Sequence, residues 1–163
     1  MENGHPSEPR FVCDDHLGKL ARYLRVGGFD AAFDRDMTDS RLIRIALDER
    51  RWILTRDHRL VERTLVRNLF FIEQDRWPDQ LRAVLARFGL TFRKNRLFSR
   101  CLEDNGWIEP VSKESISQRV FPFTYQHHEE FFLCPICRRV YWSGTHVEAM
   151  IRRLERFGIM VSG

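Results

Sequence analysis

The alternation of short apolar runs with amphipathic helical segments over residues 10–90 constrains the fold of this chain more than any other feature. The predicted strands are residues 10–14, 29–33, 52–54 and 69–73, and the predicted helices are about 17–26, 39–47, 58–66 and 78–88. Strands that alternate with helices of this length form βαβ units with right-handed crossovers. We therefore predict an α/β domain with a mostly parallel sheet flanked by helices.

The charge balance favours a nucleic-acid partner. The chain carries a net charge of +4, and only three of its 27 basic residues are lysines, namely Lys19, Lys94 and Lys113. Arginine binds phosphate through two parallel hydrogen bonds and stacks on bases, although a bias toward GC-rich codons would enrich it equally.

No apolar run approaches the roughly 20 residues of a membrane span, and residues 1–9 lack a signal-peptide core. We expect a mobile tail over residues 1–9, a cytoplasmic location, reduced cysteines and no membrane partner.

Three aspartates occur where predicted strands end or helices begin. Asp14 follows the first strand, Asp57 follows the third, and Asp39 begins the helix between the second and third strands. Because parallel strands share a carboxyl edge, Asp14 and Asp57 should lie there together, and Asp39 joins them if its helix begins there. Converging carboxylates suit Mg²⁺ or Mn²⁺, which can activate water for attack on a phosphodiester. Asp75 is the best candidate for a fourth acid, and the alternative is that these acids cap helices or face solvent.

Three of the four cysteines occur after residue 90, and the fourth is Cys13 in the first predicted strand. Cys134 and Cys137 form a Cys-x-x-Cys pair whose spacing suits a zinc knuckle, whereas a redox pair would normally lie near the start of a βαβ unit. Cys101 is a third ligand, and Asp104 stands where a second such pair would have its other cysteine. The alternatives for the fourth ligand are His127, His128 and His146. A region held by apolar residues without metal is also consistent with the sequence.

Basic and aromatic residues are concentrated near both candidate sites. The arginines that we expect to contact RNA are Arg22, Arg25, Arg44, Arg56, Arg59, Arg138 and Arg139. Aromatic residues, including Trp107, Phe121, Phe123 and Trp142, are interleaved with the later arginines. Arginines that track phosphates and aromatic rings that stack on bases are typical of single-strand binding. The alternative is that most of these rings form the core of a small second domain.

Three blocks of sequence together resemble the Mut-seven C-terminal RNase domain. They are residues 10–25, residues 53–57 and residues 134–142, the last followed by Gly144 and His146. The resemblance runs over about residues 10–155 and implies a PIN-like α/β fold followed by an inserted zinc ribbon. This family occurs as free-standing bacterial proteins and as the C-terminal part of eukaryotic exonucleases that trim small RNAs.

The resemblance also implies roles for individual residues. Asp14, Asp39 and Asp57 match the acidic positions of the family, and Cys101, Cys134 and Cys137 match its zinc ligands. The second cysteine of the family is replaced here by Asp104.

These observations lead to one expected architecture and two expected functions. We expect a tail at 1–9, a PIN-like domain at 10–92 and a zinc-ribbon-like region at 93–163 that ends in a helix at about 145–157. The favoured function is a Mg²⁺- or Mn²⁺-dependent endoribonuclease of single-stranded RNA with a structural zinc ion. The alternative is a non-catalytic module that binds single-stranded RNA. Other RNA-processing proteins are possible partners in both cases, and a toxin with a cognate antitoxin is a third, weaker hypothesis.

Overall fold

The computed structural model describes residues 8–163 and divides them into two compact units. The first unit contains the described residues up to Leu24 together with Phe29–Leu90, and the second contains Arg25–Gly28 and Thr91–Gly163. The expected tail over residues 1–9 falls mainly on residues 1–7, which lie outside the described residues.

The first unit is built on a parallel sheet with the strand order β2-β1-β3-β4. Its strands are β1 (Phe11–Cys13), β2 (Ala31–Ala32), β3 (Trp52–Thr55) and β4 (Leu69–Phe71). In register, Phe11 lies opposite Ala31 and Trp52, while Thr55 lies opposite Phe71. Both central strands are almost entirely buried, as expected for parallel strands covered on two faces. The predicted parallel α/β architecture is therefore confirmed.

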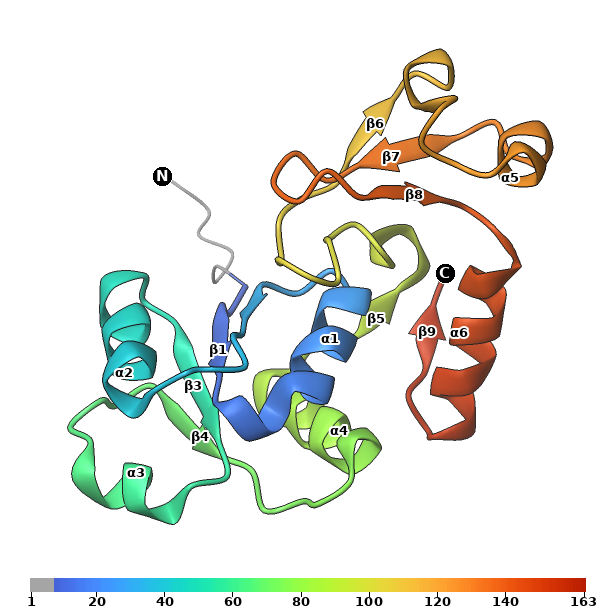
Figure 1. The fold of residues 1–163 in the computed structure, drawn as a ribbon. Coiled ribbons are helices and arrows are strands. Elements are labelled where there is room, and N and C mark those ends of the chain that lie inside the picture. Colours follow the sequence, from blue (N-terminus) through green and yellow to red (C-terminus); the bar gives the residue numbers. More distant parts are fainter. Residues whose placement is uncertain (1–7) are drawn as a thin grey trace, which may run out of the picture. The chain divides into compact units, whose positions relative to one another are not determined.

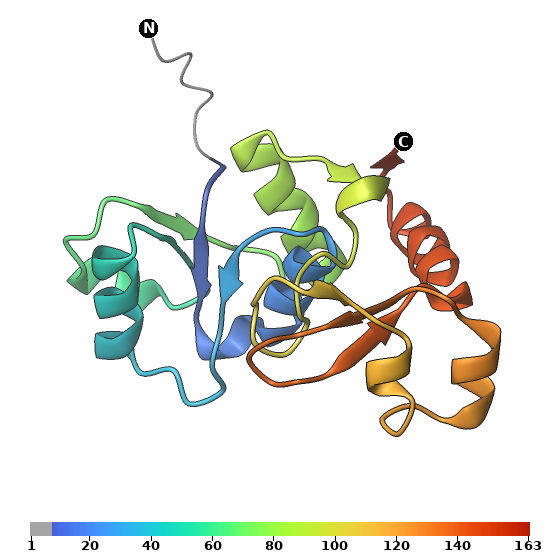
Figure 2. The same ribbon diagram turned by 90° about the horizontal axis from the view of Figure 1, so that it is seen from above.

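Helices cover both faces of this sheet, as Figures 1 and 2 show. They are α1 (Gly18–Val26), α2 (Asp39–Asp48), α3 (His58–Arg63) and α4 (Trp77–Phe88), and a short 3₁₀ turn, η1 (Asp15–Leu17), precedes α1. On one face, Val12 and Ile53 of the strands pack with Leu42 of α2 and Leu60 of α3. On the other face, Phe88 of α4 meets the rings of three successive strands, Phe11, Trp52 and Phe70, edge to face. Because successive side chains of a strand point to opposite faces of the sheet, the position of a residue in its strand determines which helices it contacts.

The helix ends follow local sequence signals. Pro78 lies in the first turn of α4, and Gly89 ends that helix with a left-handed φ of 64°. Helix α3 is shorter than the predicted 58–66, because the chain turns to an extended conformation at Thr64.

The second unit combines a small antiparallel sheet with two helices. Its elements are β5 (Phe92–Arg93), η2 (Lys94–Arg96), β6 (Glu109–Val111), η3 (Glu114–Ile116), α5 (Pro122–His127), β7 (Phe131–Leu133), β8 (Val140–Trp142), α6 (Thr145–Arg156) and β9 (Val161–Ser162). Strands β6, β7 and β8 form an antiparallel sheet, and β5 pairs with β9 in parallel. Within residues 8–163, no helix has the length and apolar character needed to cross a bilayer.

Candidate functional site

Asp14 is fixed at the carboxyl end of β1 by three hydrogen bonds. Its Oδ2 accepts from the Thr55 hydroxyl at 2.6 Å and from the Arg56 backbone N–H at 2.8 Å. Its Oδ1 accepts from the His16 backbone N–H at 3.0 Å. The residue is only 6% exposed, so these bonds replace the water that a carboxylate would otherwise need. The side chain of Asp14 is therefore held in one orientation between the ends of β1 and β3.

Thr55 connects Asp14 to Asp57. Its hydroxyl is fully buried, donates to Asp14 and accepts from the Asp57 backbone N–H at 2.9 Å. Asp57 in turn begins α3, and its Oδ1 accepts from the Arg59 N–H at 2.8 Å. The Thr55 hydroxyl therefore links Asp14 to the backbone of Asp57 by hydrogen bonds, and the Asp57 side chain caps the N-terminus of α3.

The residues directly after Asp14 complete a group of possible metal ligands. Asp14, Asp15 and His16 each offer one ligand atom, and these three atoms lie within 4.8 Å of one another. His16 Nδ1 also lies 2.9 Å from Asp15 Oδ1. Such a group could bind a catalytic ion. Sequence reasoning missed His16, and the available signal was its position two residues after Asp14 in a tight turn.

The other predicted acids have separate surroundings. Asp39 is the first, exposed residue of α2, and Thr38 caps that helix by accepting from the Arg41 N–H. Among the described residues, neither Asp39 nor Asp57 belongs to a group of three possible ligands within 4.8 Å of one another. Asp75 forms an ion pair with the Arg56 guanidinium.

The cysteines of the second unit lie on two turns with the same backbone hydrogen bonds, residues 101–106 and 134–139. In each turn the carbonyl of the first residue accepts from the N–H of the fifth, at 3.0 and 2.9 Å. The N–H of the first residue donates to the carbonyl of the sixth, at 2.7 and 2.9 Å. The fifth residues, Asn105 and Arg138, both have positive φ, 70° and 64°. The two turns are therefore equivalent structures.

This equivalence gives Asp104 the same position in the first turn as Cys137 has in the second. Together with Cys101 and Cys134, these residues offer four ligand atoms within 4.8 Å of one another. Cys101 Sγ lies 3.6 Å from Cys137 Sγ, and Cys134 Sγ lies 3.2 Å from Asp104 Oδ2. The cluster could bind a metal ion.

The protonation of this cluster follows from its mutual hydrogen bonds. Burial raises the pKa of Asp104, but hydrogen bonds from the Gly106 N–H and from the three thiols outweigh burial and lower it to about 2. Burial raises the pKa of Cys137 to about 12, and burial also raises the pKa of Cys134. Without metal, the carboxylate is thus charged and the thiols of Cys134 and Cys137 keep their protons, which a bound cation would displace.

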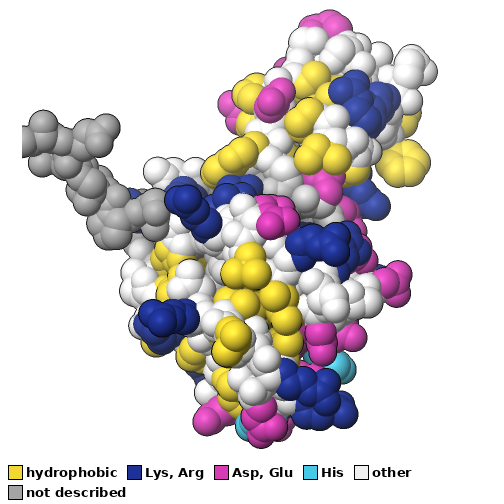
Figure 3. Space-filling view, turned by 90° about the vertical axis from the view of Figure 1, so that its left-hand side faces the viewer, with side chains coloured by type: hydrophobic (Ala, Val, Ile, Leu, Met, Phe, Trp, Pro, Cys, Tyr) yellow, Lys and Arg dark blue, Asp and Glu magenta, His cyan; other side chains and the backbone are white. Residues whose placement is uncertain are grey.

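The predicted RNA-binding arginines fall into two kinds. Arg25 is 4% exposed and donates to the carbonyls of Leu102 and Glu103 at 3.0 and 3.1 Å, so it supports the turn that carries Cys101 and Asp104. Arg56 forms an ion pair with Asp75. The exposed arginines of the prediction are Arg22, Arg44, Arg59, Arg138 and Arg139. In the view of Figure 3, basic side chains form separate groups among acidic ones.

Comparison with known proteins gives one match. The family model described as the Mut7-C RNAse domain matches residues 9–154, a range that includes both candidate metal clusters. No curated protein and no solved structure matches the chain.

Proposed function

Because the chain belongs to the Mut7-C RNAse domain family, which indicates a ribonuclease-like function, we propose that it cleaves single-stranded RNA with a divalent metal ion. This membership confirms the family resemblance found in the sequence. Metal dependence, endonucleolytic cleavage and the choice of single strands are parts of the proposal.

The observation that carries the proposal is the fixed orientation of Asp14. A carboxylate offers about four acceptor positions, and three donors occupy Asp14. The remaining acceptor capacity lies beside Asp15 and His16, which are exposed. A buried acid with a solvent-exposed acid and imidazole next to it is a suitable arrangement for a hard divalent cation.

Each residue has a definite task in this proposal. Asp14 and Asp15 would hold Mg²⁺ or Mn²⁺ with His16 beside them, and Thr55 keeps Asp14 in position. A bound ion supplies an activated water and stabilises the negative charge of the phosphodiester transition state. Asp39 and Asp57 remain proposed catalytic acids on the strength of the family pattern. Exposed arginines would bind the phosphates of the RNA.

We further propose that the second cluster holds a structural zinc ion. Zn–S bonds of about 2.3 Å and a Zn–O bond of about 2.0 Å place tetrahedral ligands about 3.8 Å (S to S) and 3.5 Å (S to O) apart. The sulfur–sulfur distance of 3.6 Å and the sulfur–oxygen distances of 3.2 and 3.4 Å agree with that geometry. The ligands would be Cys101, Asp104, Cys134 and Cys137.

The test is cleavage of labelled single-stranded RNA by the purified protein with Mn²⁺ or with EDTA. We expect cleavage with Mn²⁺ only, and we expect Asp14→Asn to reduce its rate by about 100-fold or more, since the variant weakens the metal site. Asp48→Asn, an exposed acid at the end of α2, is the matched control and should cleave like the wild type. Equal cleavage by the Asp14→Asn variant, or equal cleavage in EDTA, would contradict the proposal.

A non-catalytic RNA-binding module is the second candidate. It is favoured by the engagement of acids with basic groups, because Asp75 pairs with Arg56 and Asp57 Oδ1 lies 3.8 Å from the Arg59 Nε. The same experiment separates the two candidates. An RNA shift that weakens steeply with salt, without cleavage in Mn²⁺, would support the binding module.

A further inference from the structure

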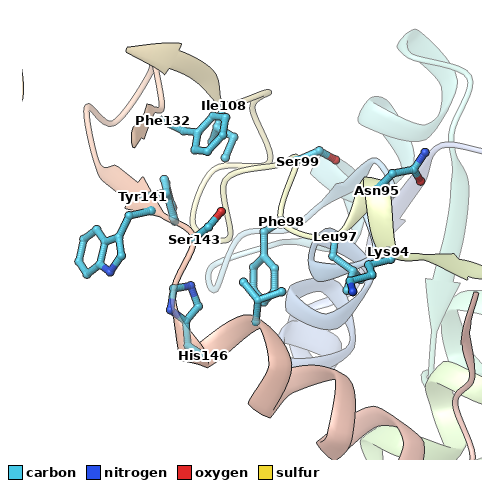
Figure 4. Close-up of a pocket in the computed structure, with 12 residues that line it drawn as sticks. Lys94, Asn95, Leu97, Phe98, Ser99, Ile108, Phe132, Tyr141, Ser143 and His146 are labelled. Atoms are coloured by element: carbon cyan, nitrogen blue, oxygen red, sulfur yellow. The ribbon is translucent and has the colours of Figure 1, made fainter. Parts of the chain in front are cut away.

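The second unit contains a cavity of about 350 Å³ next to the cysteine cluster. Its lining comes from three parts of the unit, as Figure 4 shows: Lys94, Asn95 and Leu97–Ser99, then Ile108 with Phe132 of β7, and then Tyr141–Ser143 with His146 and Val147. Tyr141 belongs to this lining, and its hydroxyl lies 3.0 Å from Cys101 Sγ. Pockets for small ligands begin at about 300 Å³, so the cavity suits a single small group and not a long segment.

Aromatic rings line the cavity without stacking on one another. The Phe98 and His146 rings have centroids 5.9 Å apart and planes at 84°, and the Trp142 and His146 rings have centroids 6.5 Å apart and planes at 85°. Because both pairs meet edge to face, neither pair uses the flat contact that a planar ligand would make. All three side chains are also at least partly exposed to solvent.

Phe98 is held beside the cavity in an unusual backbone conformation. Its φ is +57°, in the left-handed region that bulky side chains rarely adopt. Its N–H donates to the Val26 carbonyl at 2.9 Å, which keeps the backbone in place. Costly backbone conformations that the surrounding structure maintains are concentrated at binding sites.

Polar groups at the cavity suit an anionic ligand that has a polar ring. Lys94 is exposed and forms no ion pair with any of residues 8–163. Helix α6 follows Gly144, which has no side chain to cap it, and the partial positive charge of a helix N-terminus favours an anion nearby. The Asn95 amide and the Ser143 hydroxyl also line the cavity and can bond to the edge of a base.

We infer that this cavity binds one unstacked nucleotide of single-stranded RNA, with its base against Trp142 and its phosphate near Lys94. Aromatic faces, a cation and hydrogen-bonding groups at one site are the combination that recognises splayed bases. This inference rests on the proposed action on RNA, and it adds a second contact outside the Asp14 site.

The test measures binding and contact positions in the full chain. Fluorescence anisotropy with a labelled ten-nucleotide RNA, without Mn²⁺, should show about tenfold weaker binding for Trp142→Leu and for Lys94→Glu. The control is Met160→Ala, because Met160 is an apolar residue of the second unit that is 71% exposed and lies outside the cavity lining; its affinity should stay within about twofold of the wild type. Photocrosslinking with 4-thiouridine RNA should label residues 94–99 or 141–147.

Each outcome bears separately on the two proposals. Wild-type affinity in both cavity variants, with crosslinks elsewhere, would overturn the nucleotide site even if the protein cleaves RNA. Weakened binding and crosslinks at the cavity without any cleavage in Mn²⁺ would support the nucleotide site and contradict the nuclease. A wild-type protein that binds no RNA would overturn both. Because Lys94 is exposed, Lys94→Glu tests the site even if Trp142→Leu fails to fold.

Discussion

Thr55 is the residue on which the geometry of the acidic edge depends most. The sequence placed Asp14 and Asp57 after separate strands, and the structure connects them through this one buried hydroxyl. The hydroxyl is a donor to one acid and an acceptor for the backbone of the other, and valine of similar shape could do neither. A threonine at this position thus serves both as a strand residue and as a polar connection.

Thr55→Val should lower the free energy of unfolding by about 1–3 kcal/mol, because it leaves the Asp14 Oδ2 and the Asp57 N–H each without one partner. Urea denaturation measures this change. Thr55→Ser keeps the hydroxyl and should lose only about 1 kcal/mol, for the missing methyl group. A valine variant as stable as the wild type would show that the hydroxyl has no net effect on stability.

At the scale of elements, the two turns 101–106 and 134–139 are one structure built twice. They share the same pair of backbone hydrogen bonds and the same left-handed fifth residue. Asp104 therefore occupies the position that Cys137 has in the second turn, and its carboxylate lies where the second turn has a thiol.

Asp104→Cys should tighten zinc binding by about tenfold, because thiolate is the softer ligand and Cys₄ sites are common for structural zinc. Competition with a chromogenic chelator measures the affinity. Asp104→Asn is the control and should bind zinc more weakly than the wild type. An unchanged affinity in Asp104→Cys would mean that residue 104 is not a ligand.

Elements with a regular pattern of apolar residues could be predicted from the sequence. Elements formed by pairing of residues far apart in the chain could not. The four strands of the parallel sheet and the helices around them carry regular apolar patterns, so their positions follow from the sequence. The β5–β9 pair has only two residues a strand and joins Phe92 to Val161, which no local signal indicates. The cavity likewise combines separate segments of the chain, and its residues could not be grouped before the structure was known. Asp14 was predicted from its place after a strand, but the contribution of His16 depends on a turn that only the structure shows.

At the scale of the whole molecule, each unit has its own buried core. In the first unit, Val12, Leu42 and Ile53 belong to one cluster. In the second, Phe131 and Leu154 are buried, and the buried cysteines Cys101 and Cys134 belong to the group of possible metal ligands. The stability of the second unit should therefore depend on metal, whereas that of the first should not.

Removal of zinc with a chelator should speed amide hydrogen exchange in the turns 101–106 and 134–139 and in β6–β8, because loss of a structural ion loosens the segments that it joins. Exchange in β1 and β3 should stay unchanged. Mass spectrometry of the exchanged protein, with and without chelator, measures both regions at once. Equal acceleration in both units, or none in the turns, would contradict this expectation.

Helix α1 has a consequence for how such a chain can evolve. Its residues up to Leu24 belong to the parallel-sheet unit. The end of the helix and the turn after it, Arg25–Gly28, belong to the second unit. Arg25 is satisfied by the carbonyls of Leu102 and Glu103, and the Gly28 carbonyl accepts from Arg96 and Arg100. A recombination event that exchanged only residues 93–163 would replace the turn whose carbonyls Arg25 binds, and a turn of different shape would weaken these hydrogen bonds of a buried guanidinium, which is costly. We therefore expect residues 93–163 to be exchanged between proteins together with Arg25–Gly28, which precede them by more than sixty positions in the chain.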